Sequence, residues 1–168
     1  MDASNSSIHG KHSDDSKSET TVMMLPSDAN PKGNVFGGVI LKHVDLIAGL
    51  VAKRHAGHAN VVTASIDRMT FLRPVFIGNA LILFARLNYV KRSSMEVEVT
   101  IMAEDLDSGE RSLTGTAFVS VVALSDAGKP VKVMPLILST EEEKRRFLEG
   151  ESRMNVRLQG AGRPNLHP

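Results

Sequence analysis

The residues best suited to chemistry lie between Ser27 and Asp45, where a polar loop with several glycines leads into an apolar run. Asp45 is the one carboxylate in that run, and Gly37 and Gly38 stand at its start. If the run is a helix, the backbone N–H groups at the two glycines have no intrahelical acceptor, and no side chain blocks an approaching oxygen. The stretch therefore predicts an oxyanion-binding helix N-terminus with a carboxylate about two turns further along.

Asp45 has two interpretations from the pattern alone. On a helical wheel it lies at the edge of a narrow stripe with Lys42, Gly49 and Lys53. A solvated aspartate beside Lys42 would explain it without any function. A carboxylate partly desolvated at a contact between subunits would instead suit general-base or nucleophilic catalysis. Spacing does not separate these two interpretations.

Other catalytic motifs fit this region poorly. A Walker A loop needs lysine and then serine or threonine directly after its last glycine, where this chain has valine and isoleucine. A Rossmann fingerprint needs the pattern G-x-G-x-x-G in a parallel βαβ unit, and neither is present. His43 and Asp45 point in different directions on a helix, so they cannot form a local dyad. We interpret His43, His55 and His58 as structural residues and predict no metal site.

A second polar cluster lies where two β-rich runs meet, in the sequence VKRSS. Lys91 and Arg92 stand there beside Ser93 and Ser94. Guanidinium, ammonium and hydroxyl groups all suit phosphate oxygens, so the cluster fits a phosphate-binding site. An ordinary solvated hairpin turn explains the same residues.

The elements that carry these residues follow one order along the chain. A short apolar run that ends at Pro26 predicts a first strand. Gly38 to His55 is apolar over most of a helical circumference and predicts a largely buried helix. A last helical segment opens near Ser139 with a Ser/Thr cap followed by glutamates. Four β-rich runs lie between the two helices: residues 60–74, 79–92, 93–107 and 110–128.

These runs predict a sheet with one face against a core. In the third run, apolar residues from Met95 to Ile101 alternate with polar residues from Glu96 to Thr100, which places the two sets on opposite faces. Turn-like segments with glycine join the later runs, so we expect an antiparallel sheet. A helix that is apolar nearly all round is covered only if such a sheet curves around it, and its far side predicts contact with a partner subunit. The predicted fold class is α+β.

Composition bounds the molecule as a whole. With 168 residues, of which 42% are hydrophobic, the chain suits one domain with a sizeable core. A net charge of +1 gives no strongly basic face, so no nucleic-acid partner is expected. The absence of cysteine excludes disulfides and thiolate metal sites, which fits a cytoplasmic protein. The start of the chain lacks a signal peptide, and no run reaches the roughly 18 apolar residues of a membrane span, so no membrane association is expected.

The polar ends of the sequence predict the limits of the domain. Residues 1–19 are rich in serine, aspartate and lysine and predict a disordered N-terminal tail. Residues 152–168 predict a flexible C-terminal tail for the same reason. The single folded domain is therefore predicted to span residues 20–151.

Several motifs together resemble one known family. They are DAN, GNVFGG, Asp45, NVVTASIDRMTFLRPVFIGN and VKRSSMEVEV, in this order along the chain. From Thr20 to Pro135 the sequence is similar to the acyl-CoA thioesterases of the hotdog fold, in particular the bacterial short- and medium-chain acyl-CoA hydrolases and the animal brain-type cytosolic acyl-CoA hydrolase. The resemblance implies an antiparallel sheet wrapped around one long central helix, and hydrolysis of acyl-CoA to fatty acid and CoA.

The resemblance also implies roles for individual residues. The family's catalytic pair is an asparagine before the helix and an acid within it, which match Asn30 and Asp45, and the two meet across a dimer seam. The thioester carbonyl would point toward the N–H groups at Gly37 and Gly38. The implied assembly is a homodimer, often within a trimer of dimers, and CoA is part of the substrate, so no separate cofactor is expected. The residues assigned to substrate and CoA binding are Thr63, Lys91, Arg92, Ser93 and Ser94.

Two other functions remain open beside hydrolysis. A non-catalytic acyl-CoA-sensing module would keep the CoA contacts but would not need the acid. A hotdog hydratase or dehydratase usually has a histidine five residues after the aspartate, where this chain has Leu50. The presence of both Asn30 and Asp45 favours hydrolysis, and the sequence does not indicate which acyl chain length is preferred.

Overall fold

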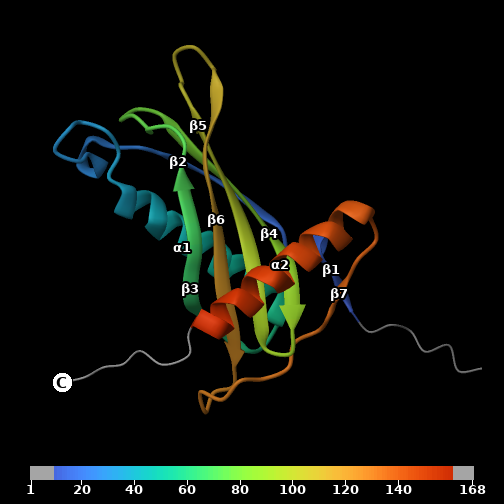
Figure 1. The fold of residues 1–168 in the computed structure, drawn as a ribbon. Helices are drawn as coiled ribbons and strands as arrows, with labels where there is room; N and C mark the ends of the chain where they lie inside the picture. Colours follow the sequence, from blue (N-terminus) through green and yellow to red (C-terminus); the bar gives the residue numbers. More distant parts are fainter. Residues whose placement is uncertain (1–9, 161–168) are drawn as a thin grey trace, which may run out of the picture.

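The computed structural model describes residues 10–160, and its main element is a five-stranded antiparallel sheet (Figure 1). The strands are hydrogen-bonded in the order β2-β4-β5-β6-β3, so β2 and β3 form the two edges. The strand bounds are Ser18–Met23 for β2, Asn60–Phe71 for β3, Ala80–Lys91 for β4, Ser94–Glu104 for β5 and Arg111–Leu124 for β6. The predicted order of a strand, a helix and four further strands is confirmed.

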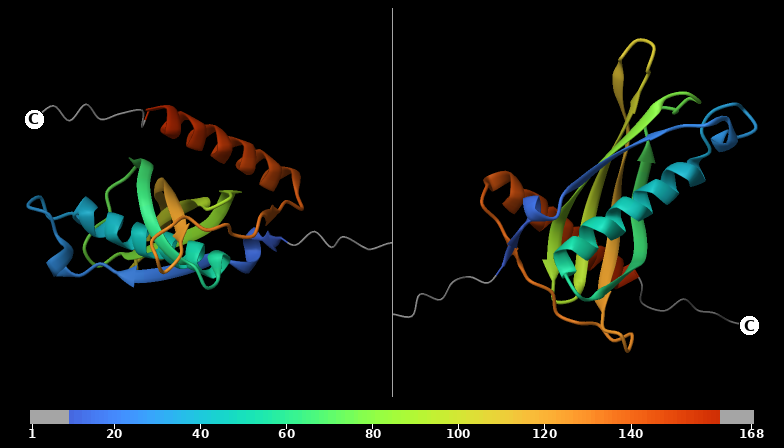
Figure 2. Two further views of the ribbon diagram at one scale, coloured as in Figure 1. Left: turned by 90° about the horizontal axis from the view of Figure 1, so that it is seen from below. Right: turned by 180° about the vertical axis from the view of Figure 1, so that it is seen from behind.

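Helix α1, Gly37–Ala56, lies inside the curve of this sheet and contacts all five strands (Figure 2). Val44 and Val51 on its inner side are fully buried, because apolar residues recur there at the helical period. Its outer side is different, since Leu46 is 60% exposed and Leu50 is 43% exposed. The predicted apolar helix is thus confirmed, and one side of it is left uncovered by its own sheet.

Strand β5 shows the predicted alternation. The apolar side chains from Met95 to Ile101 are fully buried in the core beneath α1. Glu96 and Glu98 lie on the opposite face of the sheet. Helix α2, Glu141–Gly160, packs over that face (Figures 1 and 2). The sheet therefore has a helix on each side: α1 is bound by apolar contacts, and α2 by ion pairs together with the buried Met154 and a contact between the rings of Phe147 and Tyr89.

The N-terminal segment is more ordered than predicted. The short elements of the fold are β1 Lys11–His12, the 3-10 turns η1 Ser13–Asp15 and η2 Pro26–Asp28, and β7 Leu136–Ile137. Strand β1 pairs in parallel with β7, and the buried Ser13 hydroxyl donates a hydrogen bond to the carbonyl oxygen of Leu87 at 2.8 Å. The predicted tail over residues 1–19 is therefore wrong from residue 10 onward, because hydrogen bonds hold a segment that has little apolar surface. Residues 1–9 lie outside the described residues.

The predicted C-terminal tail is also wrong in part, because helix α2 extends into it. The sequence predicts a flexible segment from residue 152, but α2 continues to Gly160, and residues 161–168 lie outside the described residues. The helix is strongly polar, so its apolar pattern does not reveal its full length. Met154 is buried, and arginines reach acids on the sheet. Within residues 10–160, neither helix combines the length and the apolar character needed to cross a membrane.

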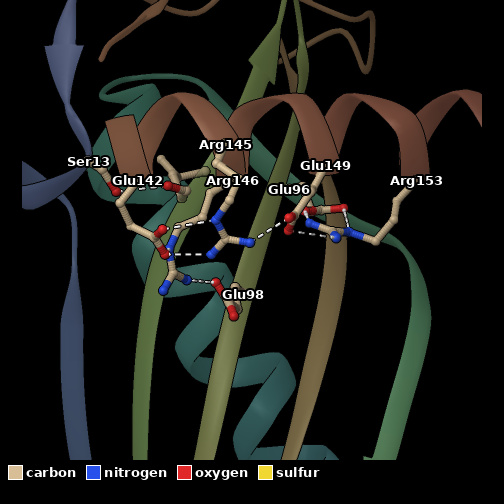
Figure 3. A network of polar contacts seen from close by, with 9 residues as sticks. Ser13, Glu96, Glu98, Glu142, Arg145, Arg146, Glu149 and Arg153 are labelled. Atoms are coloured by element: carbon tan, nitrogen blue, oxygen red, sulfur yellow. Dashed lines mark hydrogen bonds and ion pairs between the residues drawn. The ribbon is translucent and has the colours of Figure 1, made fainter. Parts of the chain in front are cut away.

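Ion pairs join α2 to the sheet (Figure 3). Arg153 donates two hydrogen bonds to Glu96, from Nε to Oε2 at 3.0 Å and from Nη2 to Oε1 at 2.8 Å, and the Glu96 side chain is 0% exposed. The guanidinium of Arg153 also lies 3.9 Å above the ring centre of Phe118. Arg146 pairs with Glu98 on the same strand. Because a carboxylate is stable in an interior only when it is paired, these contacts fix where α2 lies on the sheet.

His55 lies at the C-terminal end of α1 and is 4% exposed. Its Nε2 is 2.8 Å from the carbonyl oxygen of Met134 and therefore carries the hydrogen, while Nδ1 has no hydrogen-bond partner within residues 10–160. Burial has the largest effect on the pKa of His55 and lowers it below 6.5. The hydrogen bond to Met134 and the charge of Asp15 oppose that shift, and the charge of Lys11 adds to it.

Replacing Arg153 with methionine should lower the free energy of unfolding by about 3–5 kcal/mol, because Glu96 would stay buried without its counter-charge. Arg145→Met is the matched control. Arg145 lies on the same helix, is 56% exposed and pairs with exposed Glu142 and Glu149, so its loss should lower the free energy of unfolding far less than the loss of Arg153. Urea unfolding followed by circular dichroism gives both values, and equal losses in the two variants would contradict a special role for the buried pair.

The stability of the protein should fall as the pH drops below 6.5. The unfolded chain takes up a proton on His55 near pH 6.5, whereas the folded protein takes it up only at lower pH. Between these two pKa values the unfolded state binds more protons, so the free energy of unfolding rises with pH. His55→Gln should remove this part of the dependence, as measured by urea midpoints at about pH 7.5 and about pH 5.5. The same dependence in the variant would assign it to other groups.

Candidate active site

Asp45 and Thr63 form a hydrogen-bonded pair between α1 and β3. The Thr63 hydroxyl donates to Oδ1 of Asp45 at 2.6 Å, a distance typical of a hydroxyl bound to a carboxylate. Because the inner side of α1 is fixed in the core, the partly buried Asp45 is turned toward this edge strand. Its Oδ2 has no hydrogen-bond partner within residues 10–160 and is available to a water or a ligand. The pair favours a positioned carboxylate over a freely solvated one.

The N-terminus of α1 presents backbone N–H groups without a side-chain cap. Phe36 is the N-cap residue and its side chain accepts no hydrogen bond from the helix. Gly37 and Gly38 are the first two helical residues, so their N–H groups precede the first bond of the helical ladder. A Cβ atom at Gly38 would overlap the exposed ring of Phe36, which would have to turn away to admit it. The backbone thus has the form predicted for an oxyanion site, and that role stays a prediction.

Asn30 lies in the loop before α1, and its side chain orders that loop. Its Oδ1 accepts hydrogen bonds from the backbone N–H of Lys32 at 2.8 Å and of Asn34 at 3.3 Å. The amide oxygen is therefore used inside the loop. The Nδ2 group has no hydrogen-bond partner in the part of the chain that the structure describes, and it is the group that Asn30 offers to a ligand.

Asn30 and Gly37 share one pocket of about 360 Å³. It lies between the N-terminus of α1, the loop before it and the segment that follows β3. Other residues that line it include Ile40, Phe71, Leu72 and Arg73. Asp45 does not line this pocket, since it lies about 12 Å further along α1 than Gly37. One chain therefore brings Asn30 to Gly37 but not to Asp45.

Strand β3 relates the two separate parts of the site. Thr63 lies near its start and contacts Asp45. Phe71 is its last residue, and the ring Cζ of Phe71 lies 3.5 Å from where a Cβ of Gly37 would be. Asp45 is thus at one end of the edge strand, and Asn30 with Gly37 is at the other.

The basic hairpin between β4 and β5 lies at the same end of the sheet as Asp45. Lys91 ends β4 and Ser94 begins β5. Ser94 and Val62, the residue before Thr63 in β3, pair with the same residue of β6, so they lie at the same level of the sheet. Arg92 in the turn has a positive φ of 54°, which is unusual for a residue with a side chain. Lys91 lies 3.9 Å from Glu151 on α2, so its charge is partly compensated. The hairpin, including Ser93, does not join Asn30 in the pocket described above.

Sequence reasoning missed part of the site. It did not assign Phe71, Leu72 and Arg73 to the site, although all three line the pocket. The signal that could have found them is the run FLRP, in which a proline at the end of a β-rich segment indicates that the chain leaves the sheet there. It assigned Thr63 to substrate binding, which stays a prediction, and did not foresee that the Thr63 hydroxyl donates a hydrogen bond to Asp45. Within residues 10–160, no group of three or more histidine, aspartate or glutamate side chains is arranged to hold a metal ion.

Comparisons with known proteins agree with this architecture. Residues 32–110 match the model of the thioesterase superfamily. The cytosolic acyl coenzyme A thioester hydrolase of Rattus norvegicus is 37% identical over 154 residues, which cover 89% of this chain and 40% of that protein. An uncharacterised acyl-CoA thioester hydrolase of Bacillus subtilis is 40% identical over 129 residues, covering 77% of this chain and 74% of that protein. The chain thus spans less than half of the mammalian relative and most of the bacterial one.

Solved structures give the same result. An apo hexameric acyl-CoA thioesterase superposes with a TM-score of 0.86 at 38% identity, covering 94% of this chain and 100% of that chain. An acyl-CoA hydrolase of Staphylococcus aureus, solved with butyryl coenzyme A, coenzyme A and coenzyme A disulfide, superposes with a TM-score of 0.82 at 34% identity, covering 90% of this chain and 92% of that chain. The chain belongs to the thioesterase superfamily. The hotdog fold and the family predicted from the motifs are confirmed.

Proposed function

We propose that this protein hydrolyses acyl-CoA thioesters to a free acid and CoA, in active sites that two copies of the chain build together. The observation that carries the proposal is the placement of Asp45 at the start of edge strand β3 and of Asn30 with Gly37 at its end. The outer edge of β3 has no partner strand within residues 10–160. A long edge strand, with Val62 45% exposed and Phe71 51% exposed, favours pairing with a second chain.

Two-fold pairing of β3 with a second β3 would complete the site. In an antiparallel pair of identical strands, the start of one strand lies beside the end of the other. Asp45 and Thr63 of one subunit would then lie near Asn30 and Gly37 of the partner subunit. The symmetry repeats this arrangement at the other end of the strand pair, so each homodimer would hold two complete sites.

The groups gathered in this way suit hydrolysis of a thioester. Asp45 would take a proton from the attacking water or attack the thioester carbon itself. The N–H groups of Gly37 and Gly38 would stabilise the negative charge that develops on the carbonyl oxygen, and Nδ2 of Asn30 would orient the reacting groups. When water attacks, the carbon–sulfur bond breaks, the oxygen of water remains on the acid, and the proton taken up by Asp45 passes to the CoA thiolate. When Asp45 attacks, the thiolate leaves from a mixed anhydride on Asp45, which water then hydrolyses to the free acid, with a proton from that water going to the thiolate. Thr63 keeps Asp45 in position.

Relatives support the same chemistry and assembly. The Staphylococcus aureus enzyme carries the name acyl-CoA hydrolase, and three further structures of it have alanine in place of an asparagine, an aspartate or a threonine. That asparagine and aspartate have the same separation in sequence as Asn30 and Asp45. Hexameric neighbours support a trimer of dimers for this chain, and the name of the mammalian relative supports a cytoplasmic location. CoA enters as part of the substrate, and the proposal includes no cofactor.

The same observations favour hydrolysis over the two alternatives. A sensing module would have no use for a carboxylate held by a hydroxyl, yet Thr63 holds Asp45. The position at which a hydratase would carry its histidine is Leu50, whose side chain is 43% exposed on the uncovered side of α1.

We further propose that the hairpin from Lys91 to Ser94 binds the phosphate groups of CoA. It lies at the same end of the sheet as Asp45, so one substrate can reach both. The backbone carbonyl of Arg92 accepts a hydrogen bond from the N–H of Val133 at 2.8 Å, which fixes the turn from which the guanidinium extends. Arginine and serine side chains supply the donors that phosphate oxygens need.

The purified protein should release free thiol from acyl-CoA, and Asp45→Asn should lower kcat by on the order of 10² or more, because an amide keeps the shape but cannot accept the proton. A colorimetric thiol assay over acyl-CoAs of increasing chain length measures this release. Asp14→Asn is the matched control, since Asp14 is 75% exposed and pairs with Lys17 away from the site. Failure of the wild type to cleave any acyl-CoA would contradict the proposed function.

The shared site has its own test. Asn30→Ala should also impair turnover, and mixing it with Asp45→Asn under conditions that exchange subunits creates heterodimers. In these, one site holds both lesions and the other holds neither, so part of the wild-type activity should return. Mass spectrometry establishes that subunits have exchanged. If activity still does not return, both residues of a site come from one chain.

Replacing Arg92 with glycine should raise KM for acyl-CoA far more than it lowers kcat, because a phosphate contact remote from the reacting carbon contributes mainly uniform binding. Glycine is the suitable replacement, since the positive φ of Arg92 costs a glycine little and the fold should be at least as stable. Steady-state kinetics and a thermal melt measure the two effects. An unchanged KM in a stable variant would remove the phosphate role from this residue.

A further inference from the structure

We infer that the pocket of about 360 Å³ beside Asn30 receives the acyl chain of the substrate, and that Phe71 limits the length of the chain that it accepts. The inference rests on the proposed hydrolysis and adds to it the group that selects the substrate. Asn30 and Gly37 mark the place in this pocket where the thioester carbonyl would lie. The rest of the pocket must therefore hold one of the two groups attached to that carbonyl, the acyl chain or the sulfur side of CoA.

The walls of the pocket suit an acyl chain. Ile40 and Val75 line it and are each 2% exposed, so they form a fixed apolar wall. Most of the other lining residues are apolar too; Arg73 and Asn34 add polar groups, and the lining includes no acid. The proposed phosphate-binding hairpin lies on the Asp45 side of the site, at the end of the sheet where β3 begins. The CoA arm would thus reach the carbonyl from the subunit that provides Asp45. The acyl chain would continue into the pocket beside Asn30 of the partner subunit.

Phe71 is the aromatic residue in the lining of this pocket, and it lies beside Gly37. Its ring touches the position where a side chain of Gly37 would begin, so it lies next to the N–H group proposed to bind the carbonyl oxygen. The next residue, Leu72, donates its backbone N–H to the carbonyl oxygen of Thr114 at 2.7 Å, which fixes the backbone at the end of β3. A bulky ring on a fixed backbone beside the reacting carbonyl sets a limit on what fits behind it.

Phe71→Ala should shift the preferred substrate to longer acyl chains, and Phe71→Trp should shift it to shorter ones. Each additional methylene group that the pocket accommodates should raise kcat/KM by roughly fourfold. The measurement is kcat/KM for thiol release over straight-chain acyl-CoAs. Phe76→Ala is the matched control, because Phe76 is 53% exposed, lies in the connection that follows β3 and does not line this pocket, so its profile should equal that of the wild type.

The outcomes separate the pocket from the function. A profile shifted in opposite directions by the alanine and tryptophan variants supports the assignment. An unchanged profile overturns it, and so does an equal rise in KM at every chain length, which would place the CoA arm in the pocket. Because Phe71 lies on the proposed dimer edge, size-exclusion chromatography accompanies the kinetics, and Phe71→Leu replaces Phe71→Ala if that variant dissociates. Wild-type protein that cleaves no acyl-CoA would instead contradict the proposed hydrolysis.

Discussion

The structure depends on one packing constraint, which is that α1 has more apolar surface than its own sheet can cover. Apolar residues on one side of α1, such as Val44 and Val51, are buried against the curved sheet, and their burial fixes the rotation of the helix about its axis. That rotation turns Asp45 toward the edge strand and brings it within reach of Thr63. It also leaves Leu46 and Leu50 on the open side. The orientation of the carboxylate and the need for a partner thus have the same origin.

Edge strand β3 carries residues of both parts of the candidate site. Its start carries Thr63 against Asp45, and its end carries Phe71 against Gly37, so the two groups of polar atoms are separated along one strand. Within one chain, Asp45 does not line the pocket that holds Asn30 and Gly37. Pairing of two such edges would satisfy the unpaired backbone groups of β3 and would bring complementary groups together by symmetry. Assembly and activity therefore share a single surface in the proposed dimer.

The parts of the fold that the sequence predicts are those in which a local pattern decides the structure. The helix around Asp45 and the alternation from Met95 to Ile101 follow from periodic burial, and both are observed. The pattern did not reveal the full length of α2, because the helix is held by pairs such as Arg153 with Glu96, which are 57 residues apart in sequence. In the same way, Asp45 and Thr63 were each named, but their hydrogen bond depends on how the helix crosses the strand.

Helix α2 shows how polar contacts can define a position that apolar contacts would leave loose. Gly150 lets the helix approach the sheet closely, since a Cβ there would lie 2.9 Å from Oε1 of Glu96 and 2.9 Å from Cβ of Tyr89. At that distance Arg153 reaches Glu96 with two hydrogen bonds, and a shift of α2 along the sheet would leave the buried carboxylate unpaired. A buried ion pair of this kind adds little net stability over an apolar contact, but it tolerates only one register. The contacts with α2 thereby hold the polar face of β5 in place. The apolar face of the same strand packs against α1 and so helps to position Asp45.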